Sequence, residues 1–189
     1  MFMNSASKLD QDELLHLAIE ATQRGEHGSA ISYLKEGVSR FPNDGRIAYV
    51  LGAEFAQIGL YDKAEEEMKR AISLEPQLYT AVFQLGLLLM TQGKVSEAKT
   101  VWDKLDVLNE DHALRLFKNG LVSLADEQYN VARILLEKGL VLNTFSPELN
   151  QDMQNVLSQI PLENQMSQQP SGSAGQAWLS AYNADQISD

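Results

Sequence analysis

The sequence contains no cysteine among its 189 residues. Disulfides, thiolate metal sites and cysteine nucleophiles are therefore excluded, and the absence is consistent with a reducing compartment. The chain also lacks an apolar run that approaches the roughly 18 residues needed to span a bilayer. Its first residues, MFMNSASKLDQDELLHLAIEATQ, show no basic segment followed by an apolar stretch, so they do not match a secretory signal. These absences favour a cytoplasmic protein without membrane insertion.

Positive charge is scarce. The chain has 15 Lys and Arg against 26 Asp and Glu, which gives a formal net charge of −11. Nucleic-acid backbones and anionic membranes both bind clusters of Lys and Arg, whereas the basic residues here are scattered among acidic ones. The charge therefore argues against nucleic-acid binding and membrane docking, and its ordinary role is to keep a protein soluble.

Residue patterns that carry catalytic chemistry are also missing. Only three histidines occur (His16, His27 and His112), and none has a partner at metal-ligand spacing. No serine lies in a G-x-S-x-G setting. The stretch GSAG at 172–175 follows no predicted strand and precedes no lysine, so it does not match a phosphate loop. We therefore predict a protein that is not an enzyme, with no catalytic residues, no metal and no cofactor.

The chain does contain one residue pattern that repeats every 34 residues. Alanines recur without insertion or deletion, since 64−30, 98−64 and 132−98 are each 34. A small residue lies 12 positions before each alanine, and a large apolar residue lies four positions after it. The columns are Ala30, Ala64, Ala98 and Ala132; Ala18, Gly52, Gly86 and Gly120; and Leu34, Met68, Trp102 and Leu136. Internal periods of this length are typical of solenoid proteins.

Each repeat has the spacing of two amphipathic helices. Between Gly25 and Pro42 the apolar and small residues fall on one helical stripe, and the stretch 14–21 before Gly25 forms a second helix. A glycine between the two lets the chain reverse because it tolerates positive φ. Small residues on facing helices let the two backbones approach closely. Each repeat is therefore predicted to be an antiparallel helix pair.

These columns resemble the tetratricopeptide repeat family. The matching residues are Leu17-Ala18, Leu51-Gly52, Leu85-Gly86, Phe55, Gly59, Tyr61, the four alanines, Pro42 and Pro76. The resemblance implies an all-α fold, a right-handed α-α superhelix of four helix pairs, in a small cytoplasmic protein of the bacterial type. The chain departs from the family's pattern in the fourth repeat, at Asn119, Ser123 and Glu127, and in the third, where Glu110 replaces proline.

The predicted organisation is a lead at 1–10, repeats at 11–44, 45–78, 79–112 and 113–146, a capping helix at 147–160 and a tail at 161–189. Asp10 and Glu13 predict a capping box that opens the first helix. Ser146, Pro147 and Glu148 predict a strong helix start. The helix that follows is apolar on one stripe and polar opposite, as the terminal cap of a solenoid requires.

The tail changes composition at Leu162. The stretch ENQMSQQPSGSAGQ is rich in Gln, Ser, Gly and Pro, which is typical of a segment that does not order itself. An apolar motif follows at 177–184, with Trp178, Leu179 and Tyr182 close to i, i+1, i+4. We predict that this motif can occupy an apolar repeat surface of its own chain or of a second copy. The alternative is a disordered tail with incidental aromatic residues.

The resemblance implies that the first helix of each repeat lines the concave side. Each of these helices carries a second stripe at i, i+4, i+7, and we predict that the stripes form an apolar groove for a protein partner. Its residues are Leu15, Ile19, Tyr49, Ala53, Phe83, Leu87, Met90, Phe117, Leu121 and Leu124. The same pattern is expected if neighbouring first helices pack together and bury these side chains. Family members that hold the acidic C-terminus of heat-shock chaperones use Lys and Asn at such places, so a carboxylate clamp is not predicted.

Three functions fit these features. The first is a protein-protein adaptor or scaffold that grips a partner in the groove. The second is a secretion chaperone for a hydrophobic translocator-type substrate, and the third is a regulatory accessory subunit of an enzyme complex. The sequence does not identify the partner, and it leaves a homo-oligomer open.

Overall fold

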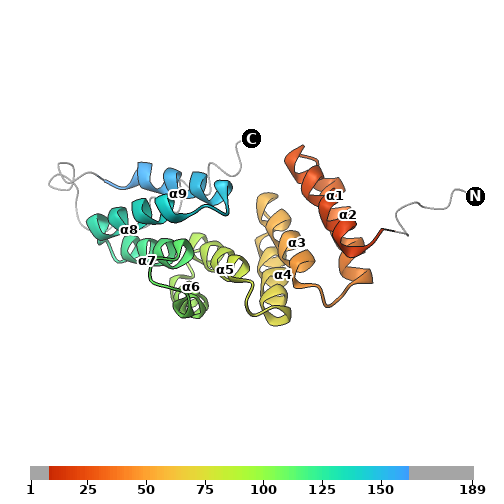
Figure 1. Cartoon of the computed structure of the whole chain (residues 1–189), viewed down its shortest axis with the longest axis horizontal. Helices are drawn as coiled ribbons and strands as arrows, with labels where there is room; N and C mark the ends of the chain where they lie inside the picture. Colours follow the sequence, from red (N-terminus) through yellow and green to blue (C-terminus); the bar gives the residue numbers. More distant parts are fainter. Residues whose placement is uncertain (1–8, 162–189) are drawn as a thin grey trace, which may run out of the picture. The chain divides into compact units, whose positions relative to one another are not determined.

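The computed structural model describes residues 9–161, and within that range helices are the only regular secondary structure (Figure 1). The predicted all-α fold class is therefore confirmed for the described part of the chain. The elements are α1 (Gln11–Gln23), α2 (His27–Arg40), α3 (Gly45–Gln57), α4 (Tyr61–Leu74), α5 (Tyr79–Thr91), α6 (Val95–Trp102), the 3-10 helix η2 (Asp103–Val107), α7 (Ala113–Ala125), α8 (Tyr129–Leu142) and α9 (Pro147–Gln159).

The repeat is visible in the helix boundaries. The first helices of the four pairs begin at residues 11, 45, 79 and 113, and the second helices at 27, 61, 95 and 129. Every step is 34 (45−11, 79−45, 113−79; 61−27, 95−61, 129−95). Helices α7 and α8 have 13 and 14 residues, the same lengths as α3 and α4. The departures from the family pattern in the fourth repeat therefore leave its helices in register.

The chain divides into two compact units inside helix α5, between Ala81 and Val82. In the first unit α1 packs on α2, α2 on α3, and α3 on α4. In the second unit α7 packs on α8, α8 on α9, and both α6 and η2 lie against α7. Each unit thus has its own set of packed helices.

The small and large columns of the repeat meet inside the helix pairs. A Cβ atom added to Gly52 would lie 2.9 Å from Met68 Cγ, and one added to Gly120 would lie 2.8 Å from Leu136. At Gly86 it would lie only 2.0 Å from Trp102 Nε1. Real Cβ atoms do not approach other atoms so closely, so the glycines make room for the large side chains 16 positions later.

The turns between paired helices need a left-handed residue. Gly25, Gly59 and Gly93 have φ values of +72°, +76° and +76°. In the fourth pair Glu127 takes the same place with φ +59°. A side chain in this region costs on the order of 1 kcal/mol because the Cβ atom crowds the carbonyl oxygen. The fourth repeat therefore keeps the same turn conformation, although this backbone conformation is strained for a glutamate.

Helix α6 is shorter than its counterparts. It has eight residues, and the chain continues as the five-residue 3-10 helix η2, whereas α2, α4 and α8 have 14 residues each. Leu105 is buried in η2 at the column where the other pairs have Gly37, Ala71 and Gly139. Space at this column is tight, since a Cβ atom on Gly139 would lie 2.5 Å from the Phe117 ring. The tighter winding of η2 coincides with the one large side chain at this place.

The predicted helix ends are confirmed. Asp10 Oδ1 accepts a hydrogen bond from the Glu13 backbone N–H at 2.9 Å, and Glu13 Oε2 accepts one from the Asp10 backbone N–H at 2.8 Å. Ser146 Oγ accepts from the Leu149 backbone N–H at 3.2 Å, and Pro147 is the first residue of α9. Helix α9 buries one apolar stripe, formed by Leu149, Met153 and Val156.

Candidate functional site

The predicted groove residues separate into an accessible group and a buried group. In the first compact unit Ile19 is 39 % exposed, and Leu15, Tyr49 and Ala53 are partly exposed. In the second unit none of the predicted side chains is more than 2 % exposed. These buried residues are Phe83, Leu87, Met90, Phe117, Leu121 and Leu124.

Aromatic packing holds Phe83 and Phe117, the two rings of the buried group. The Phe83 ring stacks on Trp102 with centroids 5.8 Å apart, and the Phe117 ring lies 6.2 Å from Phe83. Trp102 Nε1 also donates a hydrogen bond to the Phe83 carbonyl oxygen at 3.0 Å. A partner could reach these side chains only by opening the core. The predicted groove therefore does not extend over the six residues of the second unit, which belong to its core.

In the first unit the accessible positions border a buried carboxylate. Glu54, which directly follows Ala53 in α3, is 1 % exposed. Thr22 Oγ1 donates to Glu54 Oε1 at 2.6 Å, and His27 Nδ1 lies 2.9 Å from Glu54 Oε2. Each carboxylate oxygen thus has one side-chain partner, as a buried charge requires. These contacts tie α1 and the start of α2 to α3.

The sequence prediction did not include Glu54. One feature of the sequence does point to Glu54: it and Arg46 are the two charged residues in the largely apolar helix GRIAYVLGAEFAQ. A single acid among small and apolar residues on such a helix indicates a buried group with a dedicated partner. The partners Thr22 and His27 lie 32 and 27 residues away in the sequence, and no local spacing reveals them.

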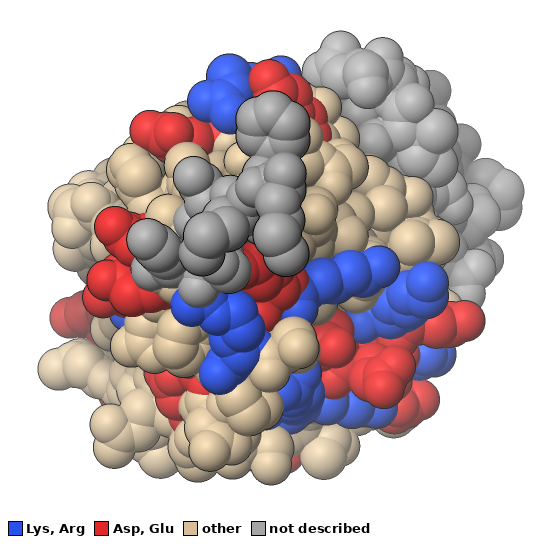
Figure 2. Space-filling view, turned by 90° about the vertical axis from the view of Figure 1, so that its right-hand side faces the viewer, with Lys and Arg blue, Asp and Glu red and all other residues tan. Residues whose placement is uncertain are grey.

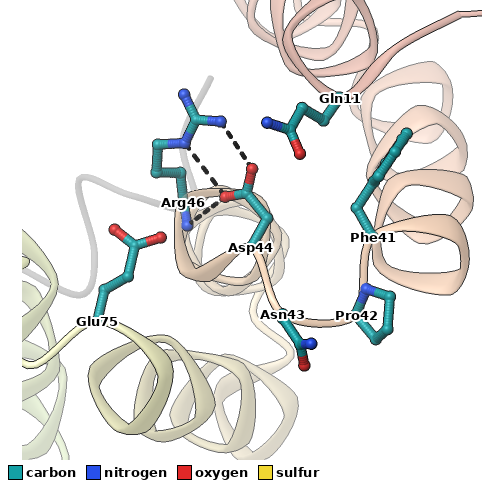
Figure 3. Close-up of a pocket in the computed structure, with 7 residues that line it drawn as sticks. All are labelled: Gln11, Phe41, Pro42, Asn43, Asp44, Arg46 and Glu75. Carbon is teal, nitrogen blue, oxygen red and sulfur yellow. Dashed lines mark hydrogen bonds and ion pairs between the residues drawn. The ribbon is translucent and has the colours of Figure 1, made fainter.

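An open pocket of about 400 Å³ lies in the same unit, and its lining is Gln11, Phe41, Pro42, Asn43, Asp44, Arg46 and Glu75. Figure 3 shows the Asp44 and Arg46 side chains turned toward each other. Arg46 Nη2 donates to Asp44 Oδ2 at 2.7 Å, and Glu75 Oε1 accepts from the Gly45 backbone N–H at 2.9 Å. The charges around the pocket are thus paired within the fold, which indicates a helix-capping junction.

Asp44 is the N-cap of α3. Burial alone would raise the pKa of its carboxyl, but hydrogen bonds from the Arg46 side chain and the Ile47 backbone N–H outweigh burial and hold that pKa below its ordinary value. Asp44 therefore stays ionised at neutral pH and supports the start of α3.

Charges of both signs mix on the surface of this unit. Figure 2 looks onto the side of the molecule that is on the right in Figure 1, and Lys and Arg side chains lie there beside Asp and Glu. Ion pairs within this unit join Arg24 Nε to Glu26 Oε1 at 3.1 Å and Arg46 Nη2 to Asp12 Oδ1 at 2.9 Å. Where described residues are visible in Figure 2, basic side chains thus lie next to acidic ones, an arrangement that phosphate backbones do not favour.

Two further observations concern chemistry and membranes. Among residues 9–161 no group of three or more His, Cys, Asp or Glu side chains is arranged to hold a metal ion. In the same range no helix combines the length and apolarity that crossing a bilayer demands. The predicted tail motif, Trp178, Leu179 and Tyr182, lies outside the described residues.

A family model described as tetratricopeptide repeat matches residues 45–78, which form the helix pair α3–α4. The chain is 23% identical over 149 residues to small glutamine-rich tetratricopeptide repeat-containing protein 2 of Saccharomyces cerevisiae, covering 79% of this chain and 41% of that protein. It is 25% identical over 100 residues to the BBSome complex member BBS4 of Bos taurus, covering 52% of this chain and 19% of that protein. The chain thus spans less than half the length of these curated relatives.

Solved structures show the same fold. MamA from Desulfovibrio magneticus RS-1 superposes with a TM-score of 0.60 at 17% identity, covering 98% of this chain and 96% of that one. PilW, described as a type IV pilus biogenesis factor, superposes with a TM-score of 0.64 at 17% identity, covering 97% of this chain and 77% of that one. Tandem helix pairs of this kind indicate a protein-protein interaction module. The helix pair at residues 45–78 thus matches a tetratricopeptide repeat, and the 34-residue period repeats the same paired-helix fold in the neighbouring pairs.

Proposed function

We propose that the chain is a non-enzymatic adaptor whose first compact unit grips apolar side chains of a partner protein. The binding residues are Leu15 and Ile19 on α1 and Tyr49 and Ala53 on α3, together called the α1–α3 surface. One observation carries the proposal: these first-helix positions stay accessible, whereas the equivalent positions of the second unit are filled by core side chains. Apolar anchors on adjacent helices suit an amphipathic helix or an extended peptide.

Charge narrows the class of partner. The chain has a formal net charge of −11, so a partner segment with basic residues beside its apolar anchors would be steered toward it. The buried Glu54 network fixes the spacing of α1 and α3 beneath this surface, because Thr22 and Glu54 bridge the two helices. A preformed surface reduces the ordering cost of binding.

Site-specific photo-crosslinking tests the proposal. A benzophenone amino acid replaces Tyr49 in the full chain, which is expressed in cells of its source organism. We expect crosslinks from position 49 to a small, defined set of proteins. A matched probe at Tyr33, on the second helix α2, should not give those crosslinks.

A pair of substitutions checks that the surface binds. Ile19→Glu should reduce the crosslink from position 49 by about tenfold or more, since it places a charge among the apolar anchors. Ile58→Glu is the control, because Ile58 is 40 % exposed at the end of α3 against 39 % for Ile19. Equal effects of the two substitutions, or identical crosslinks from positions 33 and 49, would contradict the proposal.

The crosslinked partners also separate the alternatives. An exported apolar substrate would favour a secretion chaperone, and a single enzyme subunit would favour a regulatory accessory role. Several unrelated partners that share one apolar motif would favour the adaptor.

A further inference from the structure

The outer face of helix α8 leaves large apolar side chains in solvent. Ile134 is 65 % exposed and Val141 is 81 % exposed, and Val131 at 46 % lies one turn before Ile134. Positions 131, 134 and 141 follow the helical spacing i, i+3, i+10 and lie on one side of the helix. Phe145, 48 % exposed in the loop after α8, follows at i+14. We call Val131, Ile134, Val141 and Phe145 the α8 stripe.

The α8 stripe is not a general feature of the repeat. At the positions of Val131, Ile134 and Val141, the other 14-residue second helices carry polar residues. These are Ser29, Ser32 and Ser39 in α2, and Lys63, Glu66 and Ser73 in α4. Scattered exposed apolar residues need no explanation, but a row of them on one face indicates a surface that another segment covers.

The chain itself passes next to this face. Helix α9 packs on α8, and an Arg133 guanidinium N–H donates to the carbonyl oxygen of Ile160 at 3.1 Å. Arg133 directly precedes Ile134. Ile160, directly before Pro161, therefore lies beside the N-terminal half of α8.

The segment after Pro161 is long enough to reach the α8 stripe, and it carries apolar side chains that could cover it. Residues 162–177 supply a 16-residue tether, and a Gly/Ser-type chain of that length spans about 20 Å. Helix α8 has 14 residues and a length of about 21 Å, so the whole stripe is within reach. Trp178, Leu179 and Tyr182 supply three large apolar groups at i, i+1, i+4.

Charge favours the same pairing. Residues 162–189 contain three acidic residues, Glu163, Asp185 and Asp189, and no Lys or Arg. Helix α8 carries Lys138 one turn after Ile134, where Lys138 Nζ pairs with Asp111 Oδ1 and the Lys138 side chain stays 51 % exposed. Asp185, three positions after Tyr182, would meet this cation when the aromatic residues lie on the stripe.

We propose that residues 178–182 of this chain dock on the α8 stripe of the same chain, with Trp178, Leu179 and Tyr182 against Ile134 and Val141. The inference concerns the second compact unit and does not rest on the proposed partner-binding function of the first.

The absence of cysteine makes a disulfide test direct, since two introduced cysteines are the only thiols in the full chain. Glu137→Cys lies beside the stripe without removing it, and Ser180→Cys lies within the motif while keeping its three apolar residues. The control pair is Gln154→Cys with Ser180→Cys, because Gln154 is exposed on α9 and is also within the tether's reach. The rate of intrachain disulfide formation is followed by mass spectrometry at low protein concentration.

We expect the Glu137→Cys pair to close at least about fivefold faster than the control pair, because docking raises the local concentration beyond what the tether alone provides. Two double substitutions should return that rate to the control value: Trp178→Ala with Tyr182→Ala, and Ile134→Gln with Val141→Gln. Both stripe residues are exposed, so the second double substitution should leave the far-UV circular dichroism unchanged. Equal rates for the two cysteine pairs would overturn the proposal. A closure rate that neither double substitution changes would also overturn the proposal. A disulfide that forms between two chains, at a rate that rises with protein concentration, would overturn it as well and would indicate docking on a second copy.

Discussion

The two compact units share one repeat but use its inner positions differently. Tyr49 in α3 stays partly exposed, whereas Phe117, two repeats later at the same position, is fully buried. The backbone place is the same, so the difference comes from the neighbours. Phe117 packs against Phe83 and fills the space that Gly139 leaves free. The position of a residue in the repeat therefore fixes where its Cβ points, and the neighbouring side chains decide whether it meets solvent.

The two units also differ in the partners that hold their buried charged residues. Each unit buries one charged residue on a first helix, Glu54 in α3 and Lys118 in α7. Glu54 is held by the neutral donor Thr22 and by His27, whereas Lys118 Nζ lies 2.7 Å from the carboxylate of Asp106 in η2. Removal of either partner set would leave a buried polar group without its hydrogen-bond partner, which lowers stability.

The largest expected effect comes from truncation of the two aromatic residues at the shared position. Phe117→Ala should lower the free energy of unfolding by about 3–5 kcal/mol, because it leaves a cavity in the core. Tyr49→Ala should cost about 1 kcal/mol, since a partly exposed ring loses less burial. Urea unfolding followed by circular dichroism measures both. Similar losses for the two variants would show that the units do not differ as the burial indicates.

A second comparison concerns the glycines that face large side chains. Gly86→Ala should cost about 2–3 kcal/mol because its Cβ would lie 2.0 Å from the rigid Trp102 indole. Gly52→Ala should cost less, about 1–2 kcal/mol, because its nearest contacts, Met68 Cγ at 2.9 Å and the Ala64 carbonyl oxygen at 3.1 Å, overlap less. Thermal unfolding measures both losses. Trp102→Leu introduces the residue type that Leu34 and Leu136 have in this column. Combined with Gly86→Ala, it should be less destabilising than the sum of the single changes. An additive double variant would argue against the clash.

The smallest expected effect comes from the turns. Glu127→Gly should raise the free energy of unfolding by about 0.5–1 kcal/mol, because glycine adopts φ +59° without strain. Gly59→Ala should lower it by about 1 kcal/mol for the opposite reason. Glu127→Ala is the control, since it removes the charge but keeps the Cβ atom. If Glu127→Ala stabilises as much as Glu127→Gly, charge rather than backbone strain is responsible.

Features fixed by local chemistry were predicted from the sequence. The capping box at Asp10 and the helix start at Ser146 depend on residues within a few positions of one another. The period of 34 and the helix pairs follow from residue columns that recur along the sequence. The pairing of small and large columns was also predictable, because both belong to one helix pair. The Gly86–Trp102 contact is an example.

The burial of the inner positions was not predictable in the same way. The apolar stripe of α5 suits both a groove and a core, and the choice depends on side chains such as Trp102 that reach it from another helix. The shortened α6 depends likewise on the space around Leu105. Glu54 escaped notice because its partners are distant in the sequence. The exposure of the α8 stripe could not be predicted either, because it depends on which face of α8 packs against α7 and α9.

The position of the Trp102 indole has a practical consequence. Trp102 is the one tryptophan among residues 9–161 and lies in the second compact unit, so its emission reports on that unit. Trp102 is fully buried, and its emission should shift to longer wavelength when water enters around it. Far-UV ellipticity, in contrast, follows the helices of both units. Separate midpoints for these two optical signals would mean that the chain melts in two steps, and coincident midpoints that it melts as one cooperative block.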